Sequence, residues 1–266
     1  MTIRVISSRD NPQYKLLRQL STSSQARRKQ GKTLLDGVHL CQAWLQHRGK
    51  PELCIVGESA RNHSEVANVL NQCAALGADC VALPDHLFTS LSQVEQGISL
   101  QFVVATPHNP GFGAIDKSCV LIDAVQDPGN LGSILRTAAA AGITQVICSE
   151  GTVFAWSPKV LRAGMGAHFQ LEIIEHANLK QLVSDSLVPV YATALQAKKT
   201  IYQTNLTRPC AWVFGNEGQG VSHELLSCVS EQLTIPQASG IESLNVAAAA
   251  AICLFEQKRQ REHSSH

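Results

Sequence analysis

The sequence is poor in aromatic residues and has no long apolar run. Phe, Trp and Tyr make up 5% of the 266 residues. No apolar stretch approaches the roughly 20 residues that a helix needs to cross a bilayer. The first ten residues lack the apolar core and cleavage site of a secretory signal. These absences argue against membrane-spanning and secreted proteins, and we expect a cytoplasmic protein with one large domain or two of ordinary size.

Closely spaced metal ligands are also missing. None of the nine cysteines belongs to a Cys-x-x-Cys pair, and the ten histidines show no His-Glu-x-x-His spacing. Most of the cysteines lie in apolar runs such as 146–148, where a cysteine behaves as a small buried hydrophobic residue. We therefore expect neither a disulfide framework nor a bound metal ion.

Several nucleotide-binding and hydrolytic signatures are absent as well. The glycine-rich segment 215–220 is neither Gly-x-Gly-x-x-Gly nor a phosphate-binding loop, because it lacks the Gly-Lys-Ser/Thr ending. No Gly-x-Ser-x-Gly elbow occurs, which argues against a hydrolase. A dinucleotide-dependent oxidoreductase needs an early glycine fingerprint and an acidic residue about 20 positions later, and we do not find them.

The charge is unevenly distributed along a nearly neutral chain. The formal net charge is +1, but residues 1–50 hold ten Lys and Arg against two acidic residues, which gives this segment +8. A basic segment of this kind is typical of proteins that meet a phosphate backbone, although a solvated helix face explains it equally well.

Alternating strand and helix patterns predict an α/β protein with two domains. Residues 1–105 form a small α/β domain, and 106–117, rich in Pro, Gly and Asn, form a linker. Within 118–266, apolar strands at 119–123 and 145–148 flank a helix at 131–141. A strand, a crossover helix and another apolar strand indicate a parallel sheet buried on both faces.

Three loops of unusual composition follow predicted strands of the second domain. They are Asp127–Gly132, Gly215–Gly220 and Pro236–Ser243. Ligands of open parallel sheets bind beyond the carboxyl ends of the strands, where glycine lets the backbone approach a ligand. Each loop alone is explained by an ordinary turn, but their order and spacing favour one shared site.

In that order and spacing the loops resemble the signature motifs of the SpoU/TrmH branch of the SPOUT RNA methyltransferases. The matching segments are Asp127–Ala138, Val213–Ser222 and Ile235–Val246, together with Ser157–Ala167. Segments Ser8–Asn11 and Leu35–His39 are similar to the family's L30e-like substrate-binding domain, so the resemblance covers nearly the whole chain. The sequence departs from the family pattern at Ala247–Ala249 and at Gln237, where the family often has methionine.

The resemblance implies an enzyme that methylates a ribose 2′-hydroxyl of RNA with S-adenosylmethionine. It implies a C-terminal trefoil-knotted parallel-sheet domain, a smaller L30e-like domain before it, and a homodimer with the active site near the subunit interface. The strand pattern by itself fits an unknotted sheet equally well.

Site residues follow from the same resemblance. The implied cofactor-binding residues are Gly215, Ile235 and Leu244, with Thr193 and Ala194 as further pocket residues. The implied catalytic positions are Arg136, Asn130, Glu217, Ser243 and Asn245. Arginine is a poor base, with a pKa of roughly 12.5–13.8, so we expect Arg136 to stabilise developing charge or to hold a phosphate. We expect Asn130 to orient Arg136 or the ribose, Glu217 to position Arg136 or close its loop, and Ser243 and Asn245 to order the third loop.

The basic N-terminal region is then expected to grip structured RNA through its phosphates. The candidate contacts are Arg9, Lys15, Arg27, Arg28, Lys29 and Arg162. Ribosomal RNA is the favoured substrate, and transfer RNA is the competing one. A non-catalytic RNA-binding or ribosome-assembly protein that keeps the fold is the alternative from another functional class.

Overall fold

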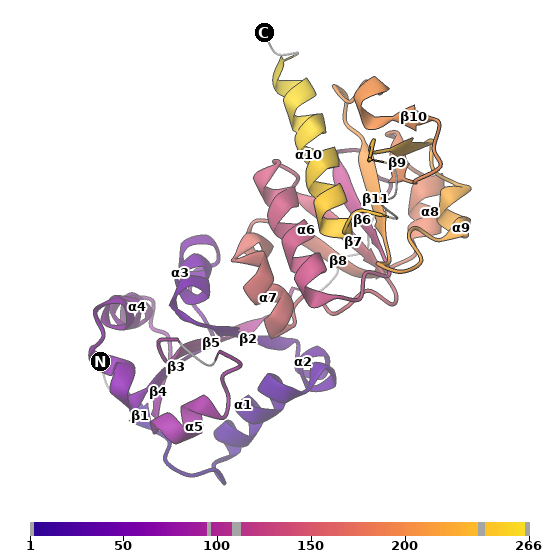
Figure 1. Cartoon of the computed structure of the whole chain (residues 1–266). Helices are drawn as coiled ribbons and strands as arrows, with labels where there is room; N and C mark the ends of the chain where they lie inside the picture. Colours follow the sequence, from indigo (N-terminus) through magenta and orange to yellow (C-terminus); the bar gives the residue numbers. More distant parts are fainter. Residues whose placement is uncertain (1–2, 95–96, 108–112, 239–242, 264–266) are drawn as a thin grey trace. The chain divides into compact units, whose positions relative to one another are not determined.

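The computed structural model describes residues 3–94, 97–107, 113–238 and 243–263. The chain divides into two compact units (Figure 1). The first unit comprises Met1–His108 and Trp156–Phe169, and the second comprises Asn109–Ala155 and Gln170–His266. Part of the predicted linker 106–117, residues 108–112, lies outside the described residues.

The first unit is built on a five-stranded sheet with the order β1-β4-β3-β5-β2. Its strands are β1 (Arg4–Val5), β2 (Lys32–Asp36), β3 (Leu53–Gly57), β4 (Cys80–Leu83) and β5 (Leu100–Ala105). Strand β5 runs antiparallel to β2 and β3, while β3 and β1 run parallel to β4. Its helices are α1 (Pro12–Thr22), α2 (Ser24–Gln30), α3 (Val38–His47), η1 (Glu58–Asn62), α4 (Ser64–Ala75), α5 (Asp85–Thr89), α7 (Pro158–Gly164) and η2 (Ala167–Phe169).

Alternating side chains of this sheet face two different cores. One face packs its apolar side chains, such as Leu53 and Ile55, with residues of α1 and α5. Helices α3 and α4 lie on the opposite side in Figure 1. Because successive side chains of a strand point to opposite faces, Cys54 and Val56 face this second core.

A segment from far along the sequence completes the first unit. Helix α7 packs on β2. The Thr33 hydroxyl donates a hydrogen bond of 2.7 Å to the carbonyl of Trp156, and the Arg48 Nε donates one of 3.0 Å to the carbonyl of Phe169. Trp44 packs edge-on against Phe169. The domain boundaries expected from the sequence place this segment in 118–266, whereas its contacts group it with the first unit.

The second unit contains a seven-stranded parallel sheet, as the strand pattern predicts. The strand order is β10-β12-β9-β11-β6-β7-β8. The strands are β6 (Cys119–Asp123), β7 (Gln145–Ser149), β8 (Glu172–Ala177), β9 (Val190–Thr193), β10 (Lys199–Thr200), β11 (Ala211–Gly215) and β12 (Glu231–Thr234). The helices are α6 (Pro128–Ala140), α8 (Leu179–Ser184), η3 (Ile201–Gln203), α9 (His223–Leu226) and α10 (Val246–His263).

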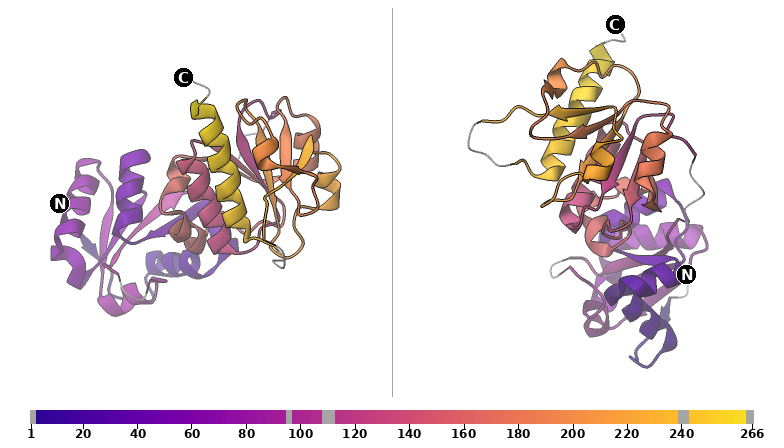
Figure 2. Two further views of the ribbon diagram at one scale, coloured as in Figure 1. Left: turned by 45° about the horizontal axis from the view of Figure 1, so that its top comes forward. Right: turned by 90° about the vertical axis from the view of Figure 1, so that its right-hand side faces the viewer.

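Helices cover both faces of this sheet. Helices α6 and α10 pack side by side on one face, as Figure 1 and the left view of Figure 2 show. Residues of α8 and α9 join the core on the other face. The central strands are therefore buried on both sides, which explains their nearly continuous apolar sequence.

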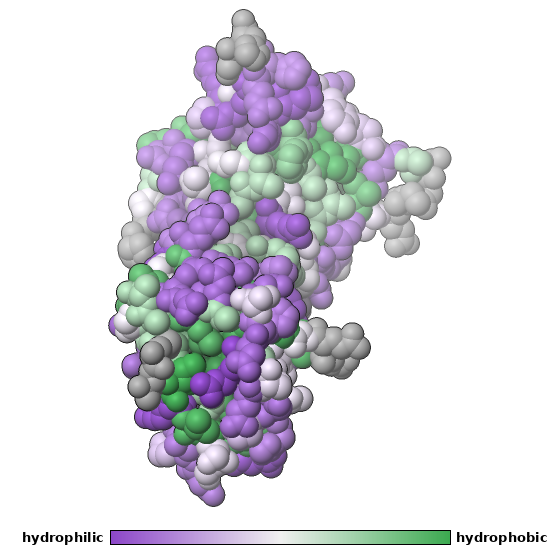
Figure 3. All heavy atoms as spheres, turned by 90° about the vertical axis from the view of Figure 1, so that its left-hand side faces the viewer, coloured by the Kyte–Doolittle hydropathy of each residue, from purple (hydrophilic) through white to green (hydrophobic). Residues whose placement is uncertain are grey.

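Helix α10 is apolar in its N-terminal half and hydrophilic at its C-terminal end (Figure 3). Ala249, Ala250, Cys253 and Leu254 are buried. Hydrophilic side chains surround its C-terminal end, at the top of Figure 3. None of the described helices combines the length and apolarity that crossing a membrane requires.

Candidate functional site

A cavity of about 870 Å³ lies at the carboxyl ends of β9, β11 and β12 in the second unit. All five predicted cofactor-binding residues line it, and so does the predicted Ser243; they are Thr193, Ala194, Gly215, Ile235, Leu244 and Ser243. Because the strands are parallel, their carboxyl ends meet at one edge of the sheet. The second and third loops therefore converge on one cavity.

The second loop is held in a tight turn that only glycine permits at its first position. A Cβ atom placed on Gly215 would lie 2.1 Å from the carbonyl carbon of Gly220. Asn216 and Gly220 exchange two backbone hydrogen bonds of 3.0 and 2.8 Å, which close the loop. The Asn216 side chain donates to the carbonyl of Ala124 at 2.9 Å and ties this loop to the chain after β6.

Side chains from the first loop, from the second loop and from Asn245, just after the third loop, form one hydrogen-bonded chain. The Glu217 carboxylate accepts hydrogen bonds from the backbone N–H groups of Gln126 and Asp127, at 3.2 and 3.0 Å. It also accepts one from the Asn130 amide at 3.0 Å. Asn130 in turn accepts a hydrogen bond of 2.9 Å from the Asn245 amide. Three of the predicted catalytic residues thus contact one another.

Asp127, whose backbone N–H contacts Glu217, and Asn245 also cap helices. Asn130 donates its backbone N–H to the Asp127 carboxylate at 2.8 Å, at the start of α6. Asn245 accepts the backbone N–H groups of Ala247 and Ala248, at 2.9 and 3.3 Å, at the start of α10. These caps satisfy N–H groups that a helix leaves unpaired at its first turn. The network therefore aligns the first turns of α6 and α10 beside the cavity.

The environment of Glu217 favours its charged form. Partial burial raises the pKa of this carboxyl, but the hydrogen bonds from Asn130 and from the backbone of Glu217, Asp127 and Gln126 outweigh it, and the pKa is lowered. A lowered folded-state pKa stabilises the fold above the unfolded pKa of about 4.3. This contribution is lost as the pH falls through the folded value, so the charged network is intact at neutral pH.

Replacing Glu217 with glutamine is expected to weaken binding of the ligand of this cavity by about fivefold to tenfold. An amide presents one oxygen and one NH₂ group where the carboxylate accepts three donors, and a hydrogen bond to an exposed charged group contributes about 1 kcal/mol. Calorimetric titration at pH 7 measures the change. Glu150→Gln, an exposed substitution with the same charge change, is the control. Equal affinities in both variants would contradict the role of the network.

Arg136 stands apart from these contacts. It is exposed on α6, and no hydrogen bond or ion pair joins its side chain to another described residue. Six residues separate it from Asn130, which turns the two side chains to different sides of the helix at 3.6 residues per turn. Of the roles expected for Glu217, these contacts fit loop closure, and neither Glu217 nor Asn130 contacts Arg136.

All six predicted RNA-binding residues lie in the first unit, but they differ in exposure. Arg9, Lys15, Arg28 and Lys29 are exposed. Arg27 is buried, and its guanidinium donates to the carbonyls of Leu20 and Ser21.

These bonds satisfy carbonyl groups in the last turns of α1, so Arg27 has a structural role and is not available to a phosphate. Arg162 donates one hydrogen bond of 2.9 Å to the carbonyl of Gln93.

Gln237, one of the departures from the family pattern, is a further residue of the cavity. It lines the cavity, and its buried Oε1 has no hydrogen-bond partner among the residues that the structure describes. Leaving a buried acceptor unpaired costs about 1–3 kcal/mol. A ligand that brings a hydrogen-bond donor to this point recovers that cost. The signal available in the sequence was its departure from the methionine that the resembling family often carries.

Comparison with known proteins finds relatives that match nearly the whole chain. Residues 117–255 match the model of a family described as the SpoU rRNA Methylase family. The 23S rRNA (guanosine(2553)-2'-O)-methyltransferase RlmP of Bacillus subtilis is 34% identical over 257 residues, which cover 95% of this chain and 98% of that protein.

Solved structures agree with this relationship. An RNA 2'-O ribose methyltransferase superposes with a TM-score of 0.81 at 28% identity, and the match covers 97% of this chain and 99% of the other. An AdoMet-bound rRNA methyltransferase from Sinorhizobium meliloti has a TM-score of 0.84 at 25% identity, with 97% and 98% coverage.

Proposed function

Because the chain belongs to the SpoU rRNA Methylase family, we propose that it transfers the methyl group of S-adenosylmethionine to a ribose 2′-hydroxyl of ribosomal RNA. The observation that carries this proposal is the convergence of the second and third loops on the cavity of about 870 Å³. The Glu217, Asn130 and Asn245 side chains link the first loop to them. Each loop is an ordinary turn by itself, but together they enclose a space at the edge where parallel sheets bind ligands.

The residues that line the cavity offer both polar and apolar groups to S-adenosylmethionine. Gly215 and Ile235 present backbone groups at strand ends, and Leu244 and Val246 add apolar surface. The Gln237 oxygen offers an unused acceptor to an amino or hydroxyl group of the cofactor. The bound cofactor supplies a methyl group on a positively charged sulfur that departs as a neutral thioether.

Arg136 is the group we assign to the reacting ribose. Its guanidinium offers several hydrogen-bond donors that stabilise the oxygen that becomes negative as the hydroxyl loses its proton, or hold the neighbouring phosphate. Its exposure leaves all of its donors available to RNA. Asn130, Glu217 and Asn245 then act as positioning residues that hold the three loops in register.

We further propose a trefoil knot in the second unit, an L30e-like fold for the first unit, and a homodimer. Two residues support the dimer. Arg136 lies outside the hydrogen-bonded chain of Glu217, Asn130 and Asn245, which leaves it available to a site shared with a second subunit. Phe255 of α10 has a side chain that is 46% exposed. Aromatic residues are enriched in subunit interfaces, so an exposed aromatic side chain on this helix is consistent with a subunit contact.

The exposed basic residues of the first unit are proposed to hold RNA through its phosphates. Replacing Lys29 with alanine is expected to weaken RNA binding and to reduce the slope of log affinity against log salt by about 0.7–0.9, the contribution of one phosphate contact. Lys180→Ala removes the same charge from the second unit, where Lys180 pairs with Glu224, and serves as the control. An unchanged slope in Lys29→Ala would remove this residue from the interface.

A direct assay tests the proposed function. The protein is incubated with S-adenosylmethionine carrying a labelled methyl group and with ribosomal or transfer RNA that lacks modifications. We expect label in ribosomal RNA, recovered as 2′-O-methylnucleoside after digestion. Label in transfer RNA would show that transfer RNA, and not ribosomal RNA, is the substrate. Calorimetric binding of the cofactor without methyl transfer to either RNA would indicate a non-catalytic RNA-binding protein.

A further inference from the structure

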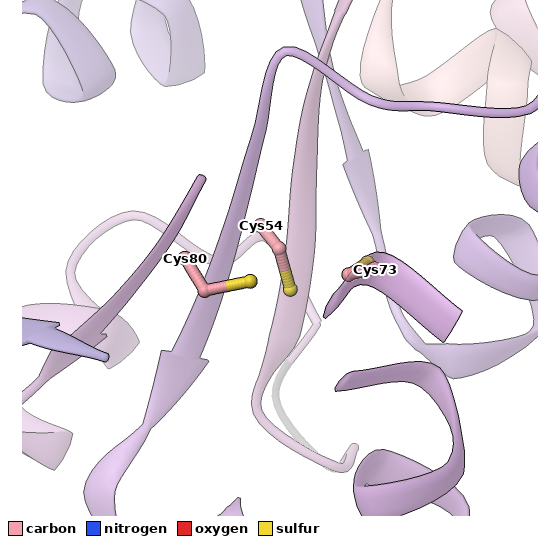
Figure 4. A group of neighbouring side chains, drawn as sticks. All are labelled: Cys54, Cys73 and Cys80. Atoms are coloured by element: carbon pink, nitrogen blue, oxygen red, sulfur yellow. The ribbon is translucent and has the colours of Figure 1, made fainter. Parts of the chain in front are cut away.

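Three cysteine thiols meet in the second core of the first unit, far in sequence from the cavity residues. Cys54 lies on β3 and Cys80 lies on the adjacent strand β4, where the two are paired in register. Cys73 comes from α4, which covers this face of the sheet. All three Sγ atoms lie within 4.8 Å of one another. Figure 4 shows the Cys80 side chain directed toward Cys54, with Cys73 on the neighbouring helix.

The spacing of these sulfur atoms is close to that of ligands on one metal ion. A metal–sulfur bond is about 2.3 Å long, so two sulfurs bound to the same ion lie about 4 Å apart. Small rotations of the thiols bring them to this distance. Strands β3 and β4 and helix α4 hold the three residues from different sides, and all three side chains are buried. The site therefore combines a preorganised set of ligands with exclusion of water.

The ligand set selects the kind of ion. Structural zinc sites almost always have four ligands, whereas the described group contains three cysteines and no histidine or carboxylate. Thiolate ligands without oxygen or nitrogen select soft ions such as Cu⁺. The composition of the cluster thus favours a soft ion with a low coordination number over Zn²⁺, Mg²⁺ or Ca²⁺.

We propose that Cys54, Cys73 and Cys80 form a binding site for a soft monovalent metal ion of the Cu⁺ and Ag⁺ type. Binding forms metal–sulfur bonds, and each cysteine that binds as a thiolate releases its proton to solvent. No electron is transferred. The bound ion would connect β3, β4 and α4 and stabilise the first unit against unfolding. This site is independent of the proposed methyl transfer.

The test uses the reduced full-length chain and Ag⁺ alone as the probe, because Ag⁺ binds like Cu⁺ and does not cycle between oxidation states. Wild-type protein is expected to bind one tight equivalent of Ag⁺ and to melt at a higher temperature with it. C148V provides the matched control, since Cys148 is a buried thiol on β7 outside the cluster. We expect C148V to behave like the wild type, and C73V to lose both the tight equivalent and the rise in melting temperature.

Equal Ag⁺ binding by C73V and C148V, or no tight equivalent in the wild type, would overturn the proposal. Circular dichroism establishes whether C73V is folded, and C73S replaces it if it is not. X-ray absorption of the wild type loaded with Cu⁺ under reducing conditions needs no variant. It is expected to show three sulfur neighbours, and a spectrum dominated by nitrogen or oxygen neighbours would contradict the site.

Discussion

Replacing Arg136 with alanine is expected to lower the rate of methyl transfer by at least about a hundredfold, the usual loss when a donor to a developing negative charge is removed. Affinity for S-adenosylmethionine is expected to stay nearly unchanged, because Arg136 is not among the described residues that line the cavity. Its exposed side chain has no described hydrogen bond, so folding is also expected to be intact. Single-turnover transfer and calorimetric titration measure the two effects separately.

The controls for this prediction distinguish charge from geometry. Arg208→Ala removes an exposed arginine of the second unit and is expected to retain activity. Arg136→Lys keeps the charge but loses the planar pair of donors, so partial recovery indicates an electrostatic role. Turnover close to wild type in Arg136→Ala would refute the assignment, and loss of cofactor binding would show that Arg136 is structural.

Replacing Gly215 with alanine is expected to reduce affinity for S-adenosylmethionine more than about a hundredfold. The added Cβ would lie 2.1 Å from the carbonyl carbon of Gly220 and 2.2 Å from the backbone nitrogen of Val221. Neither atom belongs to a flexible side chain, so the turn must open and the Asn216–Gly220 hydrogen bonds must break. Overpacking of this kind costs about 1–3 kcal/mol, which a domain with about 5–15 kcal/mol of stability survives.

Thermal melting and calorimetric titration check this prediction together. Gly113→Ala is the matched control, because a Cβ at that position meets no atom within 4 Å. We expect Gly113→Ala to keep both the wild-type melting temperature and the wild-type affinity. A folded Gly215→Ala protein that binds the cofactor normally would show that the second loop does not form the binding surface.

The sequence predicted those features that depend on local periodicity. The strands at 119–123 and 145–148 and the helix between them are confirmed as β6, β7 and α6. The two strands are buried on both faces of the sheet, and their continuous apolar residues indicate this burial in the sequence. The rule that ligands bind at the carboxyl ends of parallel strands singled out the loops that begin at Gly215 and Pro236. The family resemblance implied Gly215 and Ile235 as cofactor-binding residues, and both line the cavity.

Features that depend on side-chain direction were not predictable from the sequence. Glu217 and Asn130 are 87 positions apart, and nothing local indicates that their side chains meet. Arg27 is indistinguishable in sequence from its exposed neighbours Arg28 and Lys29, although its guanidinium is turned inward. The expectation of no metal site rested on the absence of Cys-x-x-Cys and His-Glu-x-x-His spacing, and such local patterns cannot show that cysteine side chains from β3, β4 and α4 lie close together.

The segment Trp156–Phe169 belongs to the first unit although the sequence on both sides of it belongs to the second. This arrangement limits how the protein can be cut into fragments that fold. The polypeptide passes between its two units three times, so we expect that a cut near residue 106 does not release an autonomous C-terminal fragment. Such a fragment would carry Trp156, Leu161 and Phe169, all buried in the intact chain, without the surface that shields them from water. Aggregation of the truncated protein is the physical consequence. Fusion or exchange of the first unit must therefore preserve both of its pieces.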